Sequence, residues 1–260
     1  MIRALYSSRT GMSAQQLLLD TLSNNLANVN TAGFKKSRVQ FEDLFYQTMK
    51  AAGAETADGS QIPSGIQVGM GVQPTAVQKI FTQGDYVQTN NELDWAIEGR
   101  GFFQILRNGE EYYTRAGTFT RDSEGYIVTH QGDRVQPEFA IPIDTHAVQV
   151  TQDGFISALD SDQNVIASAQ LSLHKFINPA GLRAVGGNLF QETEASGPSI
   201  ENNPGIDGMG TISQRYMETS NVDVTEELVN LIITQRAFEV NSKSVTTSDR
   251  LLEIANSLVR

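Results

Sequence analysis

The sequence contains no cysteine, which excludes disulfides, thiolate metal sites and cysteine nucleophiles. Basic residues are also scarce, because 19 Lys and Arg stand against 30 Asp and Glu and give a formal net charge of -11. Such a chain lacks the positive surface that attracts nucleic acid or an anionic membrane. We therefore expect no nucleic-acid partner.

Long apolar runs are missing as well. Near the N-terminus the longest run is Leu17 to Leu19, which is too short for a signal-peptide core. No segment is long enough to span a bilayer, so we expect no insertion into lipid. On these grounds alone the expected location is the cytoplasm. The hydrophobic fraction of 39% over 260 residues still suffices for a packed core.

Helix breakers are nearly absent from both ends of the chain. Of 22 glycines, 21 lie between Gly33 and Gly210, and all seven prolines lie between Pro63 and Pro204. Both residue types are unfavourable inside helices. The distribution predicts two helical ends around a turn-rich middle.

The C-terminal helix is predicted to start at Asp223 as N-cap, with Glu226 at the capping-box position, and to continue to Arg260. Two of its seven-residue columns are apolar, and their wide arc can contact more than one neighbour. An ordinary core helix in a monomer remains an alternative. The columns contain Val224, Leu231, Phe238, Val245, Leu252 and Val259 in one, and Ile233, Val240 and Ile254 in the other.

The N-terminal segment repeats this pattern more weakly, with Leu22 on the column beside the main one. Neither helix is expected to be stable alone, because helices gain most of their stability from packing. We interpret the apolar columns as an assembly interface. The main N-terminal column contains Leu5, Met12, Leu19 and Leu26.

The middle of the chain is predicted to be an antiparallel β meander or small barrel. Asn108-Gly109 is a strong two-residue hairpin signal between two apolar or aromatic runs. Further turns are predicted at Asp122 to Gly125, Gly132-Asp133, Asp153-Gly154 and Asp160 to Asn164.

No motif indicates catalysis, a cofactor or a metal. The calcium-like start at Asp160 lacks the glycine and the glutamate of a true loop. The histidines His130, His146 and His174 lack ligand spacing. A pair of catalytic carboxylates brought together by the fold is left open. We expect no catalytic, cofactor or metal site.

Long motifs at both ends and in the middle resemble the flagellar rod and hook protein family. They are NNLANVNTAGFKK from Asn24, GRGFFQI from Gly99, YTRAGTF from Tyr113 and ETSNVDVTEELVNLIITQRAFEVNSK from Glu218. The first also has the chemistry of a helix end, in which Gly33 takes the left-handed conformation and Phe34 packs back. Its singled-out residues are Asn24, Asn25, Asn28, Asn30, Thr31, Gly33 and Phe34.

The resemblance implies an α+β fold, with a discontinuous coiled-coil layer of N- and C-terminal helices and an inserted antiparallel β domain. We expect residues 1–35 and 216–260 to form the helical domain, 36–75 an extended β linker segment and 76–215 the β-rich outer domain.

The segment after Ile62 has a period-two pattern, which predicts an extended chain with one buried face. We expect it to lie against a neighbouring subunit and to add rigidity; a solvated linker is the alternative. The residues concerned are Ile62, Pro63, Gly65, Ile66, Val68 and Met70.

Within the family, the length, the insert from Ile62 and the closing helix resemble the distal rod members more than the longer hook protein. The implied function is a self-assembling tubular drive shaft around an export channel. Alternatives are another axial protein, proximal rod or hook, or a secreted β-domain enzyme or binding module. Implied partners are copies of itself, proximal rod proteins, hook protein and ring proteins. The implied location, a rod that crosses the periplasm and is exported uncleaved, replaces the cytoplasmic expectation.

Overall fold

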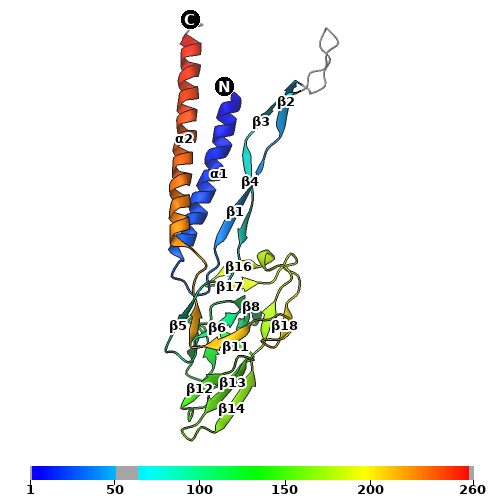
Figure 1. Ribbon diagram of the computed structural model, residues 1–260, viewed down its shortest axis with the longest axis vertical. Helices are drawn as coiled ribbons and strands as arrows, with labels where there is room; N and C mark the ends of the chain where they lie inside the picture. The colour runs from blue at the N-terminus through cyan, green and yellow to red at the C-terminus, as the bar shows by residue number, and fades with distance from the viewer. Residues whose placement is uncertain (1, 51–63, 258–260) are drawn as a thin grey trace. The chain divides into compact units, whose positions relative to one another are not determined.

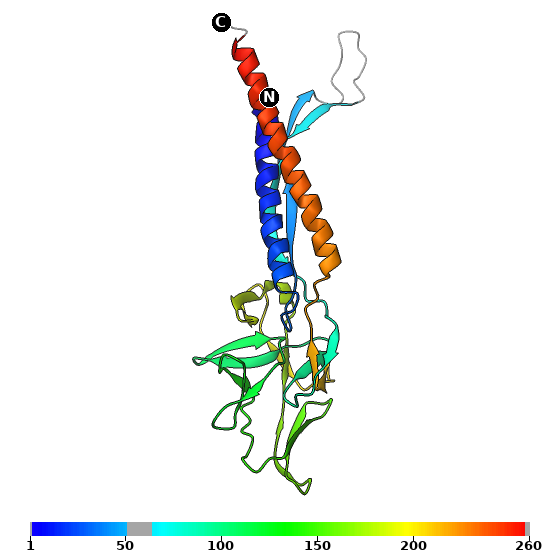
Figure 2. The same cartoon turned by 90° about the vertical axis from the view of Figure 1, so that its left-hand side faces the viewer.

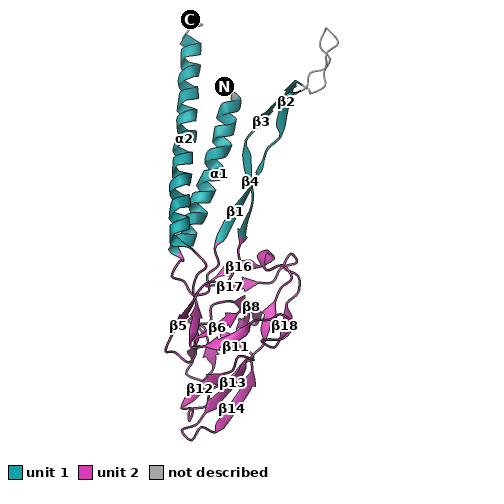
Figure 3. Cartoon of the chain, in the orientation of Figure 1, with its two compact units in different colours: residues 1–27, 37–78, 223–260 teal, residues 28–36, 79–222 magenta. Residues whose placement is uncertain are grey.

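The computed structural model describes residues 2–50 and 64–257, which fall into two compact units (Figure 3). The first unit comprises Met1–Ala27, Ser37–Gln78 and Asp223–Arg260, and the second comprises Asn28–Lys36 and Lys79–Val222. This division differs from the predicted one at 28–35 and 216–222, which lie with the β-rich unit. The predicted linker is also not separate, because 37–75 belongs to the helical unit.

Two long helices form the first unit, α1 (Ile2–Ala27) and α2 (Val224–Ser257). They lie side by side in both views and run in opposite directions (Figures 1 and 2). Asp223 caps α2 as predicted, because its Oδ1 accepts the backbone N–H groups of Thr225 and Glu226 at 2.8 and 3.2 Å. The predicted end of α2 at 258–260 lies outside the described residues.

A β ribbon completes the first unit. Its strands are β1 (Ser37–Asp43) with β4 (Val72–Lys79), and β2 (Tyr46–Lys50) with β3 (Ile66–Gly69). The second pair is antiparallel, and Tyr46 lies opposite Gly69. The predicted extended segment is therefore a strand that pairs within its own chain.

The second unit is built around a sheet of seven strands in the order β16-β17-β8-β7-β11-β10-β9. Both residues of the Asn108-Gly109 turn have positive φ, so the predicted hairpin is confirmed. The strands are β7 (Phe103–Arg107), β8 (Glu110–Thr114), β9 (Thr120–Arg121), β10 (Ile127–Val128), β11 (Arg134–Gln136), β16 (Arg183–Gly186) and β17 (Leu189–Gln191).

The smaller sheets of this unit are antiparallel too. One has three strands, β12 (Ala147–Val150), β13 (Phe155–Leu159) and β14 (Val165–Gln170). Three others are pairs: β15 (Leu173–Lys175) with β18 (Ile200–Asn202), β19 (Thr211–Gln214) with β6 (Trp95–Glu98), and β20 (Tyr216–Glu218) with β5 (Tyr86–Gln88). A short 3-10 helix spans Pro179–Gly181.

The antiparallel β domain is confirmed, but the prediction of one meander or barrel is wrong. The chain returns after β15 and β16 to place β17 beside β8, so the strand order is not sequential. The main core is fully buried around Trp95, Phe103 and Phe119. A second cluster consists of Phe102, Tyr113, Phe176, Leu182 and Phe190, with Phe81 packed against it.

Candidate assembly site

Asn25 joins three elements of the helical unit. Its Oδ1 accepts the backbone N–H of Ser37 at 2.9 Å, and its Nδ2 donates to the Ser37 carbonyl at 2.9 Å and to Glu227 Oε2 at 3.2 Å. Both Asn25 and Glu227 are buried. A single amide thus connects the end of α1, the start of β1 and the first turn of α2, which explains an asparagine at this position.

The segment after α1 forms the predicted helix end. The backbone N–H groups of Thr31 and Phe34 donate to the carbonyls of Asn28 and Thr31, and Gly33 has φ of +67°. Phe34 is buried beneath the Lys79 ammonium, which lies 4.8 Å from its ring centre. Of the remaining motif residues, Asn24 and Asn30 are exposed.

Gly33 is required for a second, non-local reason. A Cβ atom at Gly33 would lie 2.5 Å from the Ala116 backbone nitrogen and 2.7 Å from the Arg115 carbonyl carbon. Its own N–H donates to the Glu218 carbonyl at 2.9 Å. The first motif therefore packs directly on YTRAGTF and on the start of the last motif.

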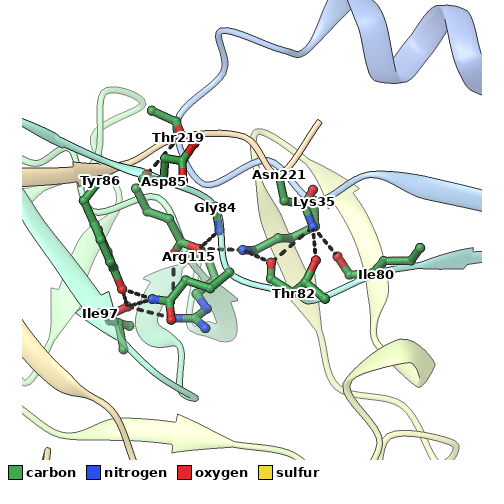
Figure 4. A network of polar contacts seen from close by, with 12 residues as sticks. Lys35, Ile80, Thr82, Gly84, Asp85, Tyr86, Ile97, Arg115, Thr219 and Asn221 are labelled. Carbon is green, nitrogen blue, oxygen red and sulfur yellow. Dashed lines mark hydrogen bonds and ion pairs between the residues drawn. The ribbon is translucent and has the colours of Figure 1, made fainter. Parts of the chain in front are cut away.

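Three buried charged side chains meet where these motifs converge: Lys35, Arg115 and Glu218, with 0%, 4% and 1% of the side chain exposed. The Lys35 ammonium lies 2.6 Å from Glu218 Oε1 and donates to the Thr82 carbonyl at 2.7 Å. Arg115 Nη1 lies 3.7 Å from Glu218 Oε2. We call these three residues the buried triad; Figure 4 shows the contacts of Lys35 and Arg115.

Backbone groups also contact the buried triad. Arg115 Nη2 donates to the Gly99 carbonyl at 2.5 Å, and the Gly84 N–H donates to Glu218 Oε1 at 3.1 Å. Asn221 fixes the same region, because its Oδ1 accepts the Lys36 N–H at 2.7 Å and its Nδ2 donates to Thr82. The arrangement holds chain segments from both ends of the sequence on the β unit.

The buried triad carries two cations and one carboxylate. Burial lowers the pKa of Lys35 and the pKa of Arg115, in each case against the attraction of Glu218. Tyr86 lies nearby with its hydroxyl on the Ile97 carbonyl at 3.1 Å, and burial followed by Glu218 raises the pKa of Tyr86 to about 12. If Lys35 were neutral, Arg115 and Glu218 would form a pair of equal and opposite charges. The positive charge on Lys35 therefore raises the free energy of the folded unit.

Small and polar residues take part in the contact between α1 and α2. Ser8 Oγ donates to Ser244 Oγ at 3.1 Å, and a Cβ at Gly11 would lie 3.0 Å from the Asn241 amide nitrogen. Thr234 and Ser248 of α2 are buried here. The small side chains allow the two helices to approach closely at Gly11.

The predicted apolar residues of α2 separate into two groups. Leu231, Phe238 and Val245 are half-buried and border the contact with α1. Ile233 and Val240 are 60% and 65% exposed and point away from it. We call Ile233, Val240 and Ile254 the outer face of α2. Val224, Leu252 and Ile254 are also exposed, and Val259 lies outside the described residues.

On α1, only Leu22 of the predicted interface is buried; the other members are half-buried, namely Leu5, Met12, Leu19 and Leu26. In the ribbon, Gly65 and Ile66 are exposed and Val68 and Met70 are half-buried. Ile62 and Pro63 lie outside the described residues.

Sequence reasoning missed Asn25 as a junction and missed the whole buried triad. Lone charged residues far apart along the chain carry no pattern of their own. The available signal was that Lys35, Arg115 and Glu218 each stand inside one of the quoted motifs.

Other features bear on chemistry and on membranes. Within residues 2–50 and 64–257, no group of three or more His, Cys, Asp or Glu is placed to hold a metal ion. No helix in that part of the chain has the length and apolarity needed to cross a membrane. The Asp160 to Asn164 segment is a hairpin turn, since the Gln163 N–H donates to the Asp160 carbonyl at 3.0 Å.

Three protein-family models match the chain, and each contains one member of the buried triad. Residues 5–35 match the flagella basal body rod protein model, 96–158 the flagellar hook protein FlgE/F/G D1 domain, and 213–258 the flagellar basal body rod FlgEFG protein C-terminal model. These matches define a structural protein of the flagellar rod and not an enzyme.

Full-length relatives make the assignment specific. FlgG of Buchnera aphidicola subsp. Schizaphis graminum is 47% identical over 99% of this chain and 100% of its own. FlgG of Borreliella burgdorferi is 46% identical and FlgG of Bacillus subtilis 39%, each over 100% of both chains. The chain belongs to the FlgG family of flagellar basal-body rod proteins, structural proteins of the distal rod.

More distant similarities also exist. FlgF of Caulobacter vibrioides is 36% identical over 100% of this chain and 97% of its own. The crystal structure of Helicobacter pylori hook protein FlgE2 aligns with 71% of this chain and 43% of that one, at 17% identity and a TM-score of 0.24.

Proposed function

We propose that copies of this chain assemble into a helical tube through the outer face of α2. The observation that supports this is the exposure of Ile233 and Val240, at 60% and 65%, on the side of α2 turned away from α1. Apolar side chains in a row on a long helix lower their free energy by packing against a partner. Because α1 covers a different side of α2, we propose that a neighbouring copy of the chain covers the outer face.

We also propose that the helices of neighbouring copies make coiled-coil contacts with one another. The half-buried Phe238 and Val245 border one contact, while the outer face of α2 supplies another. A helix that offers two different surfaces makes heterologous contacts, and these do not close into a ring when the subunits also rise along an axis. Subunits then add without limit in one direction, as a drive shaft requires.

The β ribbon is the second element of the proposal. Phe45 is 89% exposed, and Tyr46, Met49 and Ile66 are more than half exposed. An isolated two-stranded ribbon is marginally stable in water, so these side chains gain from contact with another copy. We propose that the ribbon lies against a neighbouring copy and stiffens the rod. The extended segment after Ile62 is therefore still proposed to add rigidity, and its strand β3 pairs with β2 of the same chain.

The wider setting follows from family resemblance. The tube encloses the export channel and transmits torque to the hook. Its further partners are proximal rod proteins, hook protein and the surrounding ring proteins, and its location is the part of the basal body that crosses the periplasm. Export proceeds uncleaved through the flagellar secretion apparatus.

Electron microscopy of the purified chain at rising concentration tests the proposal. Straight tubes or rods that appear above a threshold concentration are the expected result. Discrete particles at every concentration, together with a folded second unit, would argue against self-assembly through the helices.

A further inference from the structure

His174 is a buried histidine without hydrogen-bond partners for its ring. It lies in β15, where its backbone N–H and C=O bond with Phe102 at 3.0 and 2.8 Å. Its exposed fraction is 3%, and both Nδ1 and Nε2 lack a partner among the described residues. Buried polar atoms of this kind cost free energy and are uncommon in folded proteins. The residue therefore requires an explanation beyond stability.

An aromatic ring and two acidic residues lie near the His174 ring. Its ring centre lies 5.3 Å from that of Tyr113, which belongs to the cluster with Phe102 and Phe176. Glu201 stands directly opposite on β18. Glu111 on β8 accepts the Tyr113 hydroxyl at 3.3 Å.

The environment sets the protonation state of the ring. Burial lowers the pKa of His174, and the Glu201 and Glu111 carboxylates oppose that effect only in part. Those two acids, with Tyr113, are the titratable groups that face the ring from β18 and β8. Both glutamates are exposed, so a charged imidazole gains their attraction in full only by leaving the cluster.

We propose that His174 is an acid-sensitive lock on the β15–β18 pair. At neutral pH the uncharged ring stays against Tyr113, and the strand pair stays bonded to Phe102. At lower pH the ring takes up a proton, leaves the aromatic cluster and pairs with Glu201 and Glu111 at the surface. The two strands, only three residues each, then separate from Phe102.

The direction of the pH effect follows from linkage. A histidine in the opened strands has an ordinary pKa of about 6.5, above that of the closed form. The open state therefore binds the proton more readily than the closed state does. The closed state is fully favoured only above about pH 6.5. As the pH falls from about 6.5 toward the lowered value, the opening constant rises by up to about tenfold per pH unit and then levels off.

Amide hydrogen exchange of the full-length chain between pH 7.5 and 5.0 tests the proposal, with rates corrected for the intrinsic pH dependence. Residues 173–175 and 200–202 should lose protection as the pH falls, while the β7–β8 hairpin keeps it. His174→Phe should abolish this pH dependence, because the replacement fits an aromatic site and cannot titrate. The exposed His146→Gln is the matched control and should respond like the unmodified chain.

Two further measurements test the proposal even if His174→Phe does not fold. His174→Gln keeps a polar side chain without a proton to bind, so its protection should be lower but independent of pH. In the unmodified chain, the NMR titration of the His174 ring should give a pKa below the ordinary histidine value of about 6.5. An ordinary or raised pKa for the ring, or equal loss of protection in His174→Phe, would overturn the proposal.

Discussion

The Lys35 ammonium and the Glu218 carboxylate lie 2.6 Å apart, although 183 residues separate them in the sequence. Both side chains are almost completely buried, at 0% and 1% exposed. Replacing Glu218 by Gln would leave the cations of Lys35 and Arg115 buried without a counter-charge. We expect a loss of about 3–5 kcal/mol in the free energy of unfolding of the second unit.

Urea denaturation followed by fluorescence of Trp95, the one tryptophan of the chain and fully buried in that unit, measures this loss. The exposed substitution Glu253→Gln is the control and should change stability by less than about 0.5 kcal/mol. Equal stability of Glu218→Gln and the unmodified chain would show that the buried triad does not hold the unit closed.

Lys35→Met should not cause the loss of stability expected for Glu218→Gln. It removes the surplus cation and leaves Arg115 paired with Glu218, so we expect stability within about 1 kcal/mol of the original or above it. Since burial lowers the pKa of Lys35, the folded chain releases that proton before the unfolded chain does. Its contribution to the free energy of unfolding therefore rises with pH up to about 10.5.

The difference between Lys35→Met and the unmodified chain, measured by urea denaturation from pH 7 to 10, isolates this contribution. The stability of the unmodified chain minus that of Lys35→Met should increase as the pH rises. Tyr86 does not confuse the comparison, because both chains contain it and its pKa is raised to about 12. A difference that decreases as the pH rises would contradict the assigned charge balance.

Gly33→Ala tests the packing of the first motif on YTRAGTF. The left-handed φ of Gly33 costs an alanine about 1–2 kcal/mol, and the clash with the Ala116 nitrogen adds to that. Gly109→Ala is a matched control, since it has φ of +83° and no atom within 4 Å of the new Cβ. Thermal unfolding should show a clearly larger loss for Gly33→Ala. Similar losses would mean that only φ matters at both sites.

The sequence was sufficient to predict what depends on local chemistry. The left-handed glycine after α1, the Asp223 cap and the Asn108-Gly109 hairpin each follow from a few neighbouring residues. The contact of Gly33 with Ala116 does not, because it joins distant segments. The same holds for the buried triad, whose members have no periodicity that could reveal a shared interior site.

The helices and the ribbon show how periodicity identifies an element but not its partner. Seven-residue columns correctly predicted two long helices, but not the Ser8–Ser244 hydrogen bond or the close approach of Gly11 to Asn241 in the contact between them. The alternation after Ile62 predicted a strand, but a period-two pattern does not indicate which residues pair with it, here Tyr46–Lys50.

Val240→Asp should prevent rod assembly without weakening the subunit. Val240 is 65% exposed in the single chain, so a carboxylate there stays solvated until a neighbour covers it, at a cost of several kcal/mol. Phe238→Asp should also prevent assembly but weaken the helix pair, because Phe238 is half-buried. Lys243→Gln, exposed on the same helix, is the control. Electron microscopy of basal bodies distinguishes these results, and normal rods with Val240→Asp would assign the outer face of α2 to solvent.

Removing residues 51–70 should produce curved or bendable rods while leaving α1 and α2 intact. The deletion takes away β3 and with it the partner of β2, so the exposed end of the ribbon is lost. Persistence length measured on electron micrographs of isolated rods is the readout, with the full-length chain as reference. Straight rods of unchanged stiffness would place the source of rigidity elsewhere.

A cryo-electron microscopy map of the assembled rod, at a resolution that shows side chains, tests the central claim most directly. Our account predicts that Ile233, Val240 and Ile254 are buried against another copy of the chain, on a surface different from the one that α1 covers. A map in which these three side chains face solvent or the central channel, with the copies joined elsewhere, would contradict it.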